Sequence, residues 1–414
     1  MSILIKNAML DKKETNIYIE GNVIQEIGKK IEADYVVDGK NKAILPGMVN
    51  THTHAAMCLF RGYADDMNLD EWLQTKIWPL ELKLKPEDIY WGTKLACLEM
   101  IKTGTTCFND MYFFMENAAK AVDEMGLRAF LSYGFIDLFN EERREKEIKK
   151  TKETVRNIEN MHSDRIKPAL GPHAVYTVSE EALRWIKGYA DEKNLLIHFH
   201  LAETKKENED FVKKYSKKPI KYLEEIDFLD EKLIAAHCIW LTDKDINLLE
   251  KHNVKISYNP ASNMKLASGV MNYQKMKKLT VSLGTDGCAS NNNLDMFEEM
   301  KIGSLLQKSY FNNETIMPAK EIFSIATENG AKALGFNAGK IEEGKLADVL
   351  LIDLKRPELT PNHDLISDLV YSANGSAVDT TICNGKILME NRRVKGEEEI
   401  LEKAKKVALD LISR

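Results

Sequence analysis

Short apolar runs alternate with helix-periodic segments eight times through the middle of this chain. The runs are typical of buried strands, whereas the segments between them repeat apolar residues at helical spacing. The candidate strands are residues 44–50, 105–111, 129–135, 166–172, 195–200, 233–238, 254–260 and 280–287. Eight strand–helix units over roughly 290 residues predict an α/β fold, a (β/α)8 barrel of the TIM type. A doubly wound open sheet is the competing interpretation. It is disfavoured because no Gly-rich phosphate-binding turn follows the first strand.

The two ends of the chain have a different texture, with short alternating strand patterns separated by turn signals. Neither end is large enough to bury a core of its own, so we predict that they pair into one small β-sandwich domain. The expected organisation is residues 1–45 as the N-terminal part of the sandwich, 46–338 as the catalytic barrel, and 339–414 as the C-terminal part of the sandwich plus a terminal helix.

Composition excludes several classes of protein. A hydrophobic content of 44% and a charged content of 29% are typical of soluble globular proteins. The net charge of -6 is spread along the chain, which leaves no basic stripe for nucleic acid. No run approaches the ~20 apolar residues of a membrane span, and the N-terminal apolar run is too short for a signal peptide. The six cysteines are scattered singly, as is usual for reduced thiols. We therefore expect a cytoplasmic protein that binds neither nucleic acid nor a membrane.

Histidines gather at the ends of the candidate strands, where barrel enzymes of this type hold their working residues. His52 and His54 lie two positions apart in NTHTH, so on an extended strand both point to one face. Alone, such a pair is as often packed or solvated as it is metal-binding. The other polar residues at strand ends are His173, His200, His237 and Asp286. His162, His252 and His363 lie in polar helical or loop segments and have no expected chemical role.

Four motifs at these positions resemble those of the amidohydrolase superfamily: HTH after the first strand, HxxE after the fifth, HC on the sixth and GTDG on the eighth. More narrowly, HLAET (200–204), NPASNMKLASG (259–269) and GTDGCASNNNLDMFEEM (284–300) are similar to the 5′-methylthioadenosine/S-adenosylhomocysteine deaminases, and most of all to their 5′-deoxyadenosine deaminase relatives. The resemblance spans nearly the whole chain. It implies hydrolytic deamination of adenosine-type nucleosides by a homo-oligomer, for example a tetramer.

The resemblance also implies a metal site. The side chains of His52, His54, His200 and Asp286 form a nitrogen and oxygen donor set that suits one Zn²⁺ per subunit, with Fe²⁺ or Mn²⁺ as alternatives. A divalent cation lowers the pKa of a bound water and so supplies a hydroxide at neutral pH. Two-metal relatives use a carbamylated lysine at the end of strand four. Here Lys167 lies at the opposite end of that strand, so we expect a mononuclear site, which favours deamination over ring-amide hydrolysis.

Three residues are candidates for proton transfer. Glu203 lies three positions beyond His200, and we assign it as the general acid and base that protonates the purine ring. Asp286 is expected to take a proton from water and pass it to the departing ammonia, and His237 to orient the attacking oxygen by a hydrogen bond. The competing interpretations are a solvated loop acid for Glu203 and a packed core histidine for His237.

Substrate contacts follow from the same resemblance. Glu81 matches the family acid that accepts hydrogen bonds from ribose hydroxyls, and His173 matches a histidine that contacts the nucleoside. An exposed helix acid and a structural histidine are the alternatives. His198 shares the inward face with His200 but lies deeper, so we expect it to pack. Trp72 and Trp78 either wall the purine or fill the core.

One position departs from the family pattern. Members that favour S-adenosylhomocysteine present an arginine where this chain has Tyr133, and a second arginine matches Arg143 or Arg144, in a run more typical of a solvated helix face. Loss of a bidentate arginine removes an anchor worth ~1.5–3 kcal/mol. We therefore predict a preference for small uncharged 5′ groups, such as that of 5′-deoxyadenosine.

Three other functions compete with this prediction. The chain could prefer S-adenosylhomocysteine or 5′-methylthioadenosine, or act as a sibling aminohydrolase on guanine, cytosine or a chlorinated triazine. Glu81 and the run SNNNLDMFEEM favour a nucleoside. A non-catalytic binding protein on the same barrel is disfavoured because all four metal ligands and Glu203 are present.

Overall fold

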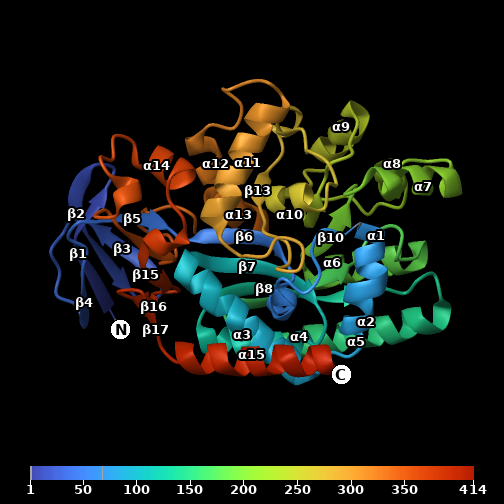
Figure 1. Ribbon diagram of the computed structural model, residues 1–414, viewed down its shortest axis with the longest axis horizontal. Helices are drawn as coiled ribbons and strands as arrows, with labels where there is room; N and C mark the ends of the chain where they lie inside the picture. The colour runs from blue at the N-terminus through green and yellow to red at the C-terminus, as the bar shows by residue number, and fades with distance from the viewer. Residues whose placement is uncertain (1, 68) are drawn as a thin grey trace.

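Eight parallel strands form a nearly closed barrel at the centre of the molecule (Figure 1). The structure is a computed structural model that describes residues 2–67 and 69–414. In chain order the barrel strands are β6 (Met48–Thr53), β7 (Thr105–Tyr112), β8 (Arg128–Phe135), β9 (Ile166–Pro172), β10 (Ile197–Leu201), β11 (Leu233–His237), β12 (Lys255–Tyr258) and β13 (Val281–Leu283). Each strand pairs with its neighbour in parallel, which confirms the predicted TIM-type α/β fold.

Hydrogen bonds across the seam join the first and last barrel strands. The Asp286 N–H donates to the His52 carbonyl at 2.9 Å, and the Thr51 hydroxyl donates to the Leu283 carbonyl at 3.0 Å. The seam therefore brings the loops that follow β6 and β13 together.

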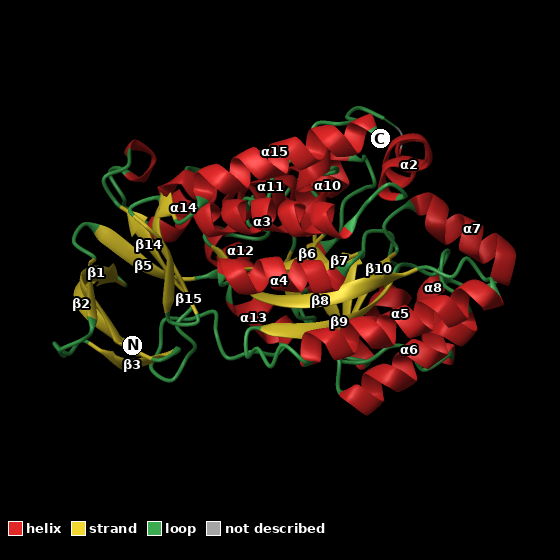
Figure 2. Cartoon of the chain, turned by 90° about the horizontal axis from the view of Figure 1, so that it is seen from below, coloured by secondary structure: helices red, strands yellow, loops and turns green. Residues whose placement is uncertain are grey.

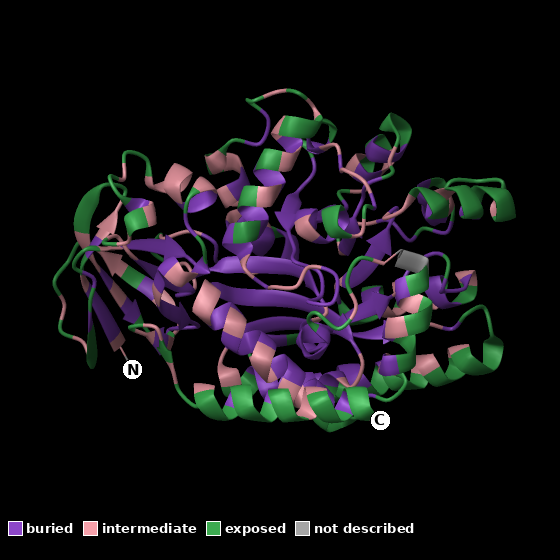
Figure 3. Cartoon of the chain, in the orientation of Figure 1, coloured by how far each residue is buried: buried purple, intermediate pink, exposed green. Residues whose placement is uncertain are grey.

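Helices cover the outside of the barrel and expose their outer faces, while the strands are buried (Figure 3). The α-helices of the barrel region are α1 (Leu69–Trp72), α2 (Trp78–Glu81), α3 (Pro86–Thr103), α4 (Met115–Met125), α5 (Glu141–Glu159), α6 (Glu180–Lys193), α7 (Lys205–Tyr215), α8 (Pro219–Glu225), α9 (Asp243–Lys251), α10 (Pro260–Lys265), α11 (Met296–Tyr310), α12 (Ala319–Ala326) and α13 (Glu328–Leu334). Short 3-10 turns at Ala55–Phe60 and Tyr273–Met276 and a π-helical turn at Leu73–Ile77 connect them. Among the described residues, no helix is long and apolar enough to span a membrane.

Two of the predicted strands have bounds that differ from those in the structure by more than two residues at an end. The predicted strand 44–50 is divided at Gly47, where a Cβ atom would collide with the side chain of Thr106. The part before the glycine belongs to a different sheet, and β6 continues past the predicted end to Thr53. The predicted strand 280–287 ends at Leu283, so Asp286 lies in the loop that follows β13.

The two ends of the chain form a second, nine-stranded sheet beside the barrel (Figure 2). Its strands are β1 (Ser2–Leu10), β2 (Lys13–Glu20), β3 (Val23–Ile27), β4 (Tyr35–Asp38), β5 (Lys42–Pro46), β14 (Val349–Asp353), β15 (Val378–Cys383), β16 (Lys386–Glu390) and β17 (Arg393–Val394). The two halves join where β5 pairs antiparallel with β14. The sheet has its own cluster of buried aliphatic side chains, including Ile3, Ile17 and Val349. The predicted separate β unit is present, and its strands form one hydrogen-bonded sheet in which β4 branches off by pairing with β1.

The last helix, α15 (Glu397–Ser413), follows the sheet in sequence but packs along the barrel against α3 (Figure 2). Arg414 ties its end to α3, because one guanidinium nitrogen lies 2.8 Å from the buried carboxylate of Asp88. Another buried ion pair, between Arg128 of β8 and Asp348 just before β14 (3.1 Å), joins the barrel to the sheet. The shorter helix α14 (Leu365–Tyr371) packs against α11 and α12.

Candidate metal centre and active site

Four possible metal ligands meet at the C-terminal ends of the barrel strands. His52 lies on β6, His54 directly follows it, His200 lies on β10, and Asp286 lies in the loop after β13. Donor atoms of the three histidines all lie within 4.8 Å of one another. The Nε2 atoms of His52 and His54 are each 3.4 Å from Asp286 Oδ1, and His54 Nε2 is 3.3 Å from His200 Nε2.

The second ring nitrogen of each of these histidines is engaged by another residue. His54 Nδ1 donates to the Met111 carbonyl at 2.6 Å, and His200 Nδ1 donates to the His173 carbonyl at 2.8 Å. His52 Nδ1 lies 2.6 Å from His198 Nε2. These partners fix the ring orientations and leave all three Nε2 atoms directed at one point, as is usual for metal-bound histidines.

Asp286 is held by three donors. Its Oδ2 accepts from the hydroxyls of Ser262 (2.6 Å) and Ser290 (3.1 Å), and its Oδ1 accepts from the Gly287 N–H at 2.8 Å. Burial alone would raise the pKa of Asp286, but the His52 imidazole, 3.4 Å away, and the charges of the other nearby imidazoles hold the pKa well below its usual value. The carboxylate is therefore ionised.

Left-handed backbone conformations aim the strand-end residues into the barrel mouth. His237 has φ of 72° and Asp286 has φ of 61°, both uncommon for residues with a side chain. His237 Nδ1 donates to Asn263 Oδ1 at 2.9 Å, which leaves Nε2 facing Glu203 at 3.8 Å. Burial favours neutral His237, but the carboxylates of Glu203 and Asp286 outweigh burial and raise its pKa.

Glu203 lies beside His237, and 14% of its side chain is exposed. Burial raises the pKa of Glu203 despite the nearby histidines. Its backbone is fixed by Glu207, whose two carboxylate oxygens accept the N–H groups of Ala202 (3.1 Å) and Glu203 (2.9 Å). Burial raises the pKa of Glu207 to about 7.

A cavity opens from the four-ligand group to the surface. Its lining includes the predicted substrate residues Glu81 and His173 and the two tryptophans Trp72 and Trp78. Tyr112 donates its hydroxyl to Glu81 Oε1 at 2.8 Å. Burial raises the pKa of Glu81 to about 7, although the tyrosine bond opposes the shift. The cavity is therefore bounded by carboxylates and aromatic rings.

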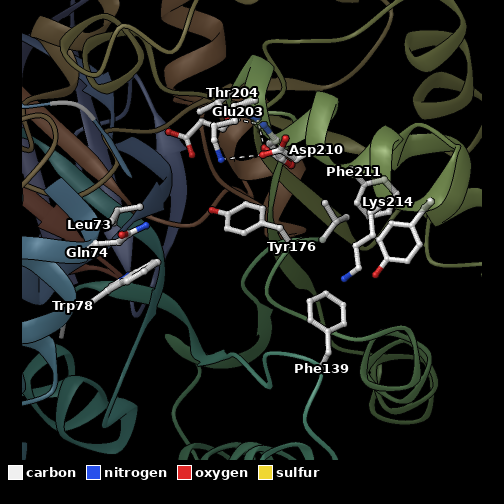
Figure 4. Close-up of a pocket in the computed structure, with 14 residues that line it drawn as sticks. Leu73, Gln74, Trp78, Phe139, Tyr176, Glu203, Thr204, Asp210, Phe211 and Lys214 are labelled. Carbon is white, nitrogen blue, oxygen red and sulfur yellow. Dashed lines mark hydrogen bonds and ion pairs between the residues drawn. The ribbon is translucent and has the colours of Figure 1, made fainter. Parts of the chain in front are cut away.

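A second compartment continues outward from the cavity (Figure 4). The two compartments share four lining residues, which are Leu73, Trp78, Tyr176 and Glu203. Leu73 and Trp78 lie on one side of the compartment, and Phe139 and Lys214 on the other, with Tyr176 between them (Figure 4). The Lys214 ammonium lies 3.9 Å from the centre of the Phe139 ring.

Tyr133 faces away from both compartments. Successive residues of a strand face opposite sides, and its neighbour Gly134 lines the cavity. Tyr133 instead faces the helix layer, where its hydroxyl bonds to Glu147 and its ring centre lies 5.5 Å from Lys150 Nζ. Arg144 donates to Ser179 at 3.5 Å. Among the described residues, Tyr133, Arg143 and Arg144 do not line either compartment.

Several contacts at the site were not assigned from the sequence. Ser262 and Asn263 lie in NPASN and Ser290 in GCASN, motifs that carry the family resemblance but gave no role to these side chains. Tyr112 and Glu207 had no sequence signal, because their partners become neighbours only on folding. His198 was expected to pack, and it is fully buried against His52.

The residues present fit a divalent metal ion. His52 Nε2 is buried without a hydrogen-bond partner, although it lies within reach of three other donor atoms. An unsatisfied buried nitrogen is costly unless a group binds it. Imidazole nitrogens with one carboxylate oxygen are ligands that suit Zn²⁺ and neighbouring divalent ions. Lys167, by contrast, is exposed at the other end of β9 and donates to the Ser163 carbonyl at 3.3 Å.

We predict that His198→Phe weakens retention of the metal by roughly 10- to 100-fold, because it removes the hydrogen bond that orients His52. Metal content is measured by mass spectrometry of elements during titration with a chelator. His363→Ala, at an exposed loop histidine, is the matched control. Equal retention in the His198 variant and the control would contradict this role.

Comparisons with known proteins agree with this geometry. The profile of the amidohydrolase family matches residues 43–388. The chain is 51% identical to a 5′-deoxyadenosine deaminase of Methanoregula boonei, over all of this chain and 96% of that protein. It is 53% identical to a 5-methylthioadenosine/S-adenosylhomocysteine deaminase of Thermococcus sibiricus, over 94% of each chain. A crystal structure of an adenosine deaminase from Xanthomonas campestris with bound zinc superposes with a TM-score of 0.94 at 31% identity, covering 100% of this chain and 99% of that one. The chain belongs to the amidohydrolase family.

Proposed function

We propose that this protein hydrolytically deaminates adenosine-type nucleosides, releasing ammonia and the corresponding inosine analogue. The main observation behind this proposal is that Glu203 and His237 lie next to the four candidate metal ligands, one of which is Asp286. All three residues line a cavity that Glu81 also lines. The names of the two close relatives and of the zinc-containing structural neighbour support the same reaction. We further propose one Zn²⁺ per subunit, with Fe²⁺ or Mn²⁺ as alternatives.

His52, His54, His200 and Asp286 would hold the ion, which activates water for attack on the amino-bearing ring carbon. The chain's own residues then manage the protons. Glu203, whose pKa is raised, holds a proton on its carboxyl group and gives it to the adjacent ring nitrogen. His237 Nε2, left free by the Asn263 bond, orients the attacking water. Asp286 is ionised, so it accepts the proton of the water and passes it to the leaving amino group.

Glu81 and His173 are proposed to bind the nucleoside. The Glu81 carboxylate lines the cavity and keeps one oxygen beyond its bond with Tyr112, so it can accept hydrogen bonds from ribose hydroxyls. His173 Nδ1 lies 2.9 Å from the Thr177 hydroxyl, which orients the ring in the cavity wall. Trp72 and Trp78 supply apolar surface for the purine.

We also propose a preference for a small uncharged 5′ group. This proposal rests on the charges that line the cavity and not on the identity of residue 133. The inner cavity is lined by the carboxyl groups of Glu81, Glu203 and Asp286, and none of its described lining residues is an arginine or a lysine. A substrate carboxylate would find no arginine or lysine partner there and would face the ionised carboxylate of Asp286.

The outer compartment favours a competing preference for S-adenosylhomocysteine. Lys206, Asp210 and Lys214 on α7 line it, so an amino-acid group carrying both charges would meet both signs. Lys206 Nζ lies 2.9 Å from Asp210, so part of this charge is already compensated inside the helix. A substrate panel separates the two preferences.

We predict that kcat/KM for 5′-deoxyadenosine exceeds that for S-adenosylhomocysteine, with ammonia release measured also for adenosine, 5′-methylthioadenosine, guanine and cytosine. The reverse order, together with a selective loss for S-adenosylhomocysteine in Lys214→Met, would establish the competing preference. Lys213→Met, at a lysine 75% exposed on the same helix, is the control.

We predict that Glu203→Gln keeps its metal and loses turnover by roughly 10²- to 10⁴-fold, because the amide cannot shuttle a proton. Ammonia release and metal content are measured on the same preparation. Glu209→Gln, at an exposed acid two residues beyond Glu207 on α7, serves as the control and should retain full activity. Unchanged turnover in the Glu203 variant would remove this residue from the mechanism.

We predict that kcat/KM falls by about tenfold between pH 8 and pH 6, because Glu81, with a pKa of about 7, loses its carboxylate charge as the pH falls. Tyr112→Phe removes the bond that lowers this pKa and should shift the fall to higher pH. Glu81→Gln should flatten it. A pH profile that Glu81→Gln leaves unchanged would assign the titration to another group.

A further inference from the structure

Two cysteines in the loops that carry His54 and Asp286 have their sulfur atoms in contact. The Sγ atoms of Cys58 and Cys288 are 3.0 Å apart, and the two residues are 4% and 0% exposed. Cys58 lies in the 3-10 turn Ala55–Phe60, which directly follows His54, and Cys288 lies two residues beyond Asp286. The structure describes all six cysteines. Among them, Cys58 and Cys288 are the only two whose sulfur atoms lie within hydrogen-bonding distance of each other.

The contact joins the two loops that meet at the barrel seam. At Gly287, between Asp286 and Cys288, an added Cβ atom would lie 2.8 Å from Met57 Sδ and 3.2 Å from His54 Cβ. The loops are therefore packed directly on each other. A bond between the two sulfurs would hold together the two segments that carry His54 and Asp286.

The position of Arg61 argues against a metal site at the two cysteines and leaves thiol chemistry as their possible role. Cys58, Cys288 and Glu99 offer three potential metal ligands. The Arg61 Nη2 atom, however, is 3.4 Å from Cys288 Sγ and 3.6 Å from Cys58 Sγ, and it also pairs with Glu99. The guanidinium thus already supplies the positive charge that a cation would bring. Its side chain is 37% exposed, so both thiols contact a side chain that reaches solvent.

We propose that Cys58 and Cys288 are an oxidative modification site, at which a small peroxide converts the two thiols into an intramolecular disulfide. Two S–H bonds break and one S–S bond forms. The two electrons and two protons pass to hydrogen peroxide, whose O–O bond breaks to give two molecules of water. The disulfide links the loop after β6 to the loop after β13 across the barrel seam, and a thiol reductant reverses it. This inference is independent of the reaction that the enzyme catalyses.

The test treats the metal-loaded protein with hydrogen peroxide and then alkylates the remaining thiols under denaturing conditions. We expect two fewer alkylated cysteines, an intact mass lower by about 2 Da before alkylation, and a non-reduced peptide that links Cys58 to Cys288. Dithiothreitol should restore all six alkylated cysteines. Separate sulfinic acids on the two residues, or a linkage that involves another cysteine, would overturn the proposal.

Variants and stability provide the controls. Cys58→Ala and Cys288→Ala should each abolish the linkage, whereas Cys97→Ala, at a buried thiol on α3, should retain it. Because the bond closes a long loop, the oxidised wild type should melt at a Tm higher by about 5 °C or more, and reductant should reverse the shift. A second equivalent of zinc that binds the wild type and is lost in both variants would instead establish a metal site and reject the disulfide.

Discussion

The seam between the first and last barrel strands is the constraint on which the site depends. The Asp286 N–H bonds to the His52 carbonyl, and the Thr51 hydroxyl lies 2.8 Å from the hydroxyls of both Ser257 and Ser282. These polar groups are fully buried, so their bonds must be kept for the barrel to close. Closure then sets the histidine pair of β6 against the carboxylate that follows β13, although the two lie at opposite ends of the barrel sequence.

Burial divides the carboxyl groups of the site into two kinds. Asp286 is surrounded by imidazoles, which hold its pKa well below the usual value. Glu203 and Glu81 are buried with fewer compensating charges, so their pKa values are raised. Neighbouring acids whose pKa values are moved in opposite directions can act as proton donor and proton acceptor at the same pH. Sequence spacing alone does not reveal this difference, since each is simply an acidic residue near a strand end or on a helix.

The barrel was predictable because each strand is buried on both faces and therefore reads as a continuous apolar run. The bounds of the first strand were wrong because packing overrides that pattern. Gly47 divides the apolar run between two sheets at a point where a Cβ atom would collide with the side chain of Thr106. The sequence pattern does not show this contact, because the two residues are neighbours only in the folded chain. The terminal helix covers α3 of the barrel, since its apolar stripe and Arg414 find partners there.

By itself, the sequence determined the eight-stranded barrel, the second β unit and the set of strand-end histidines and acids, because these follow from local periodicity and from motif spacing. The direction of each side chain was decided only by the tertiary structure. Tyr133, which stands where some relatives of the family have an arginine, faces the helix layer, because strand alternation puts Gly134 on the cavity side. The contact between Cys58 and Cys288 likewise exists only because the barrel closes, which brings two distant loops to a separation that no local pattern encodes.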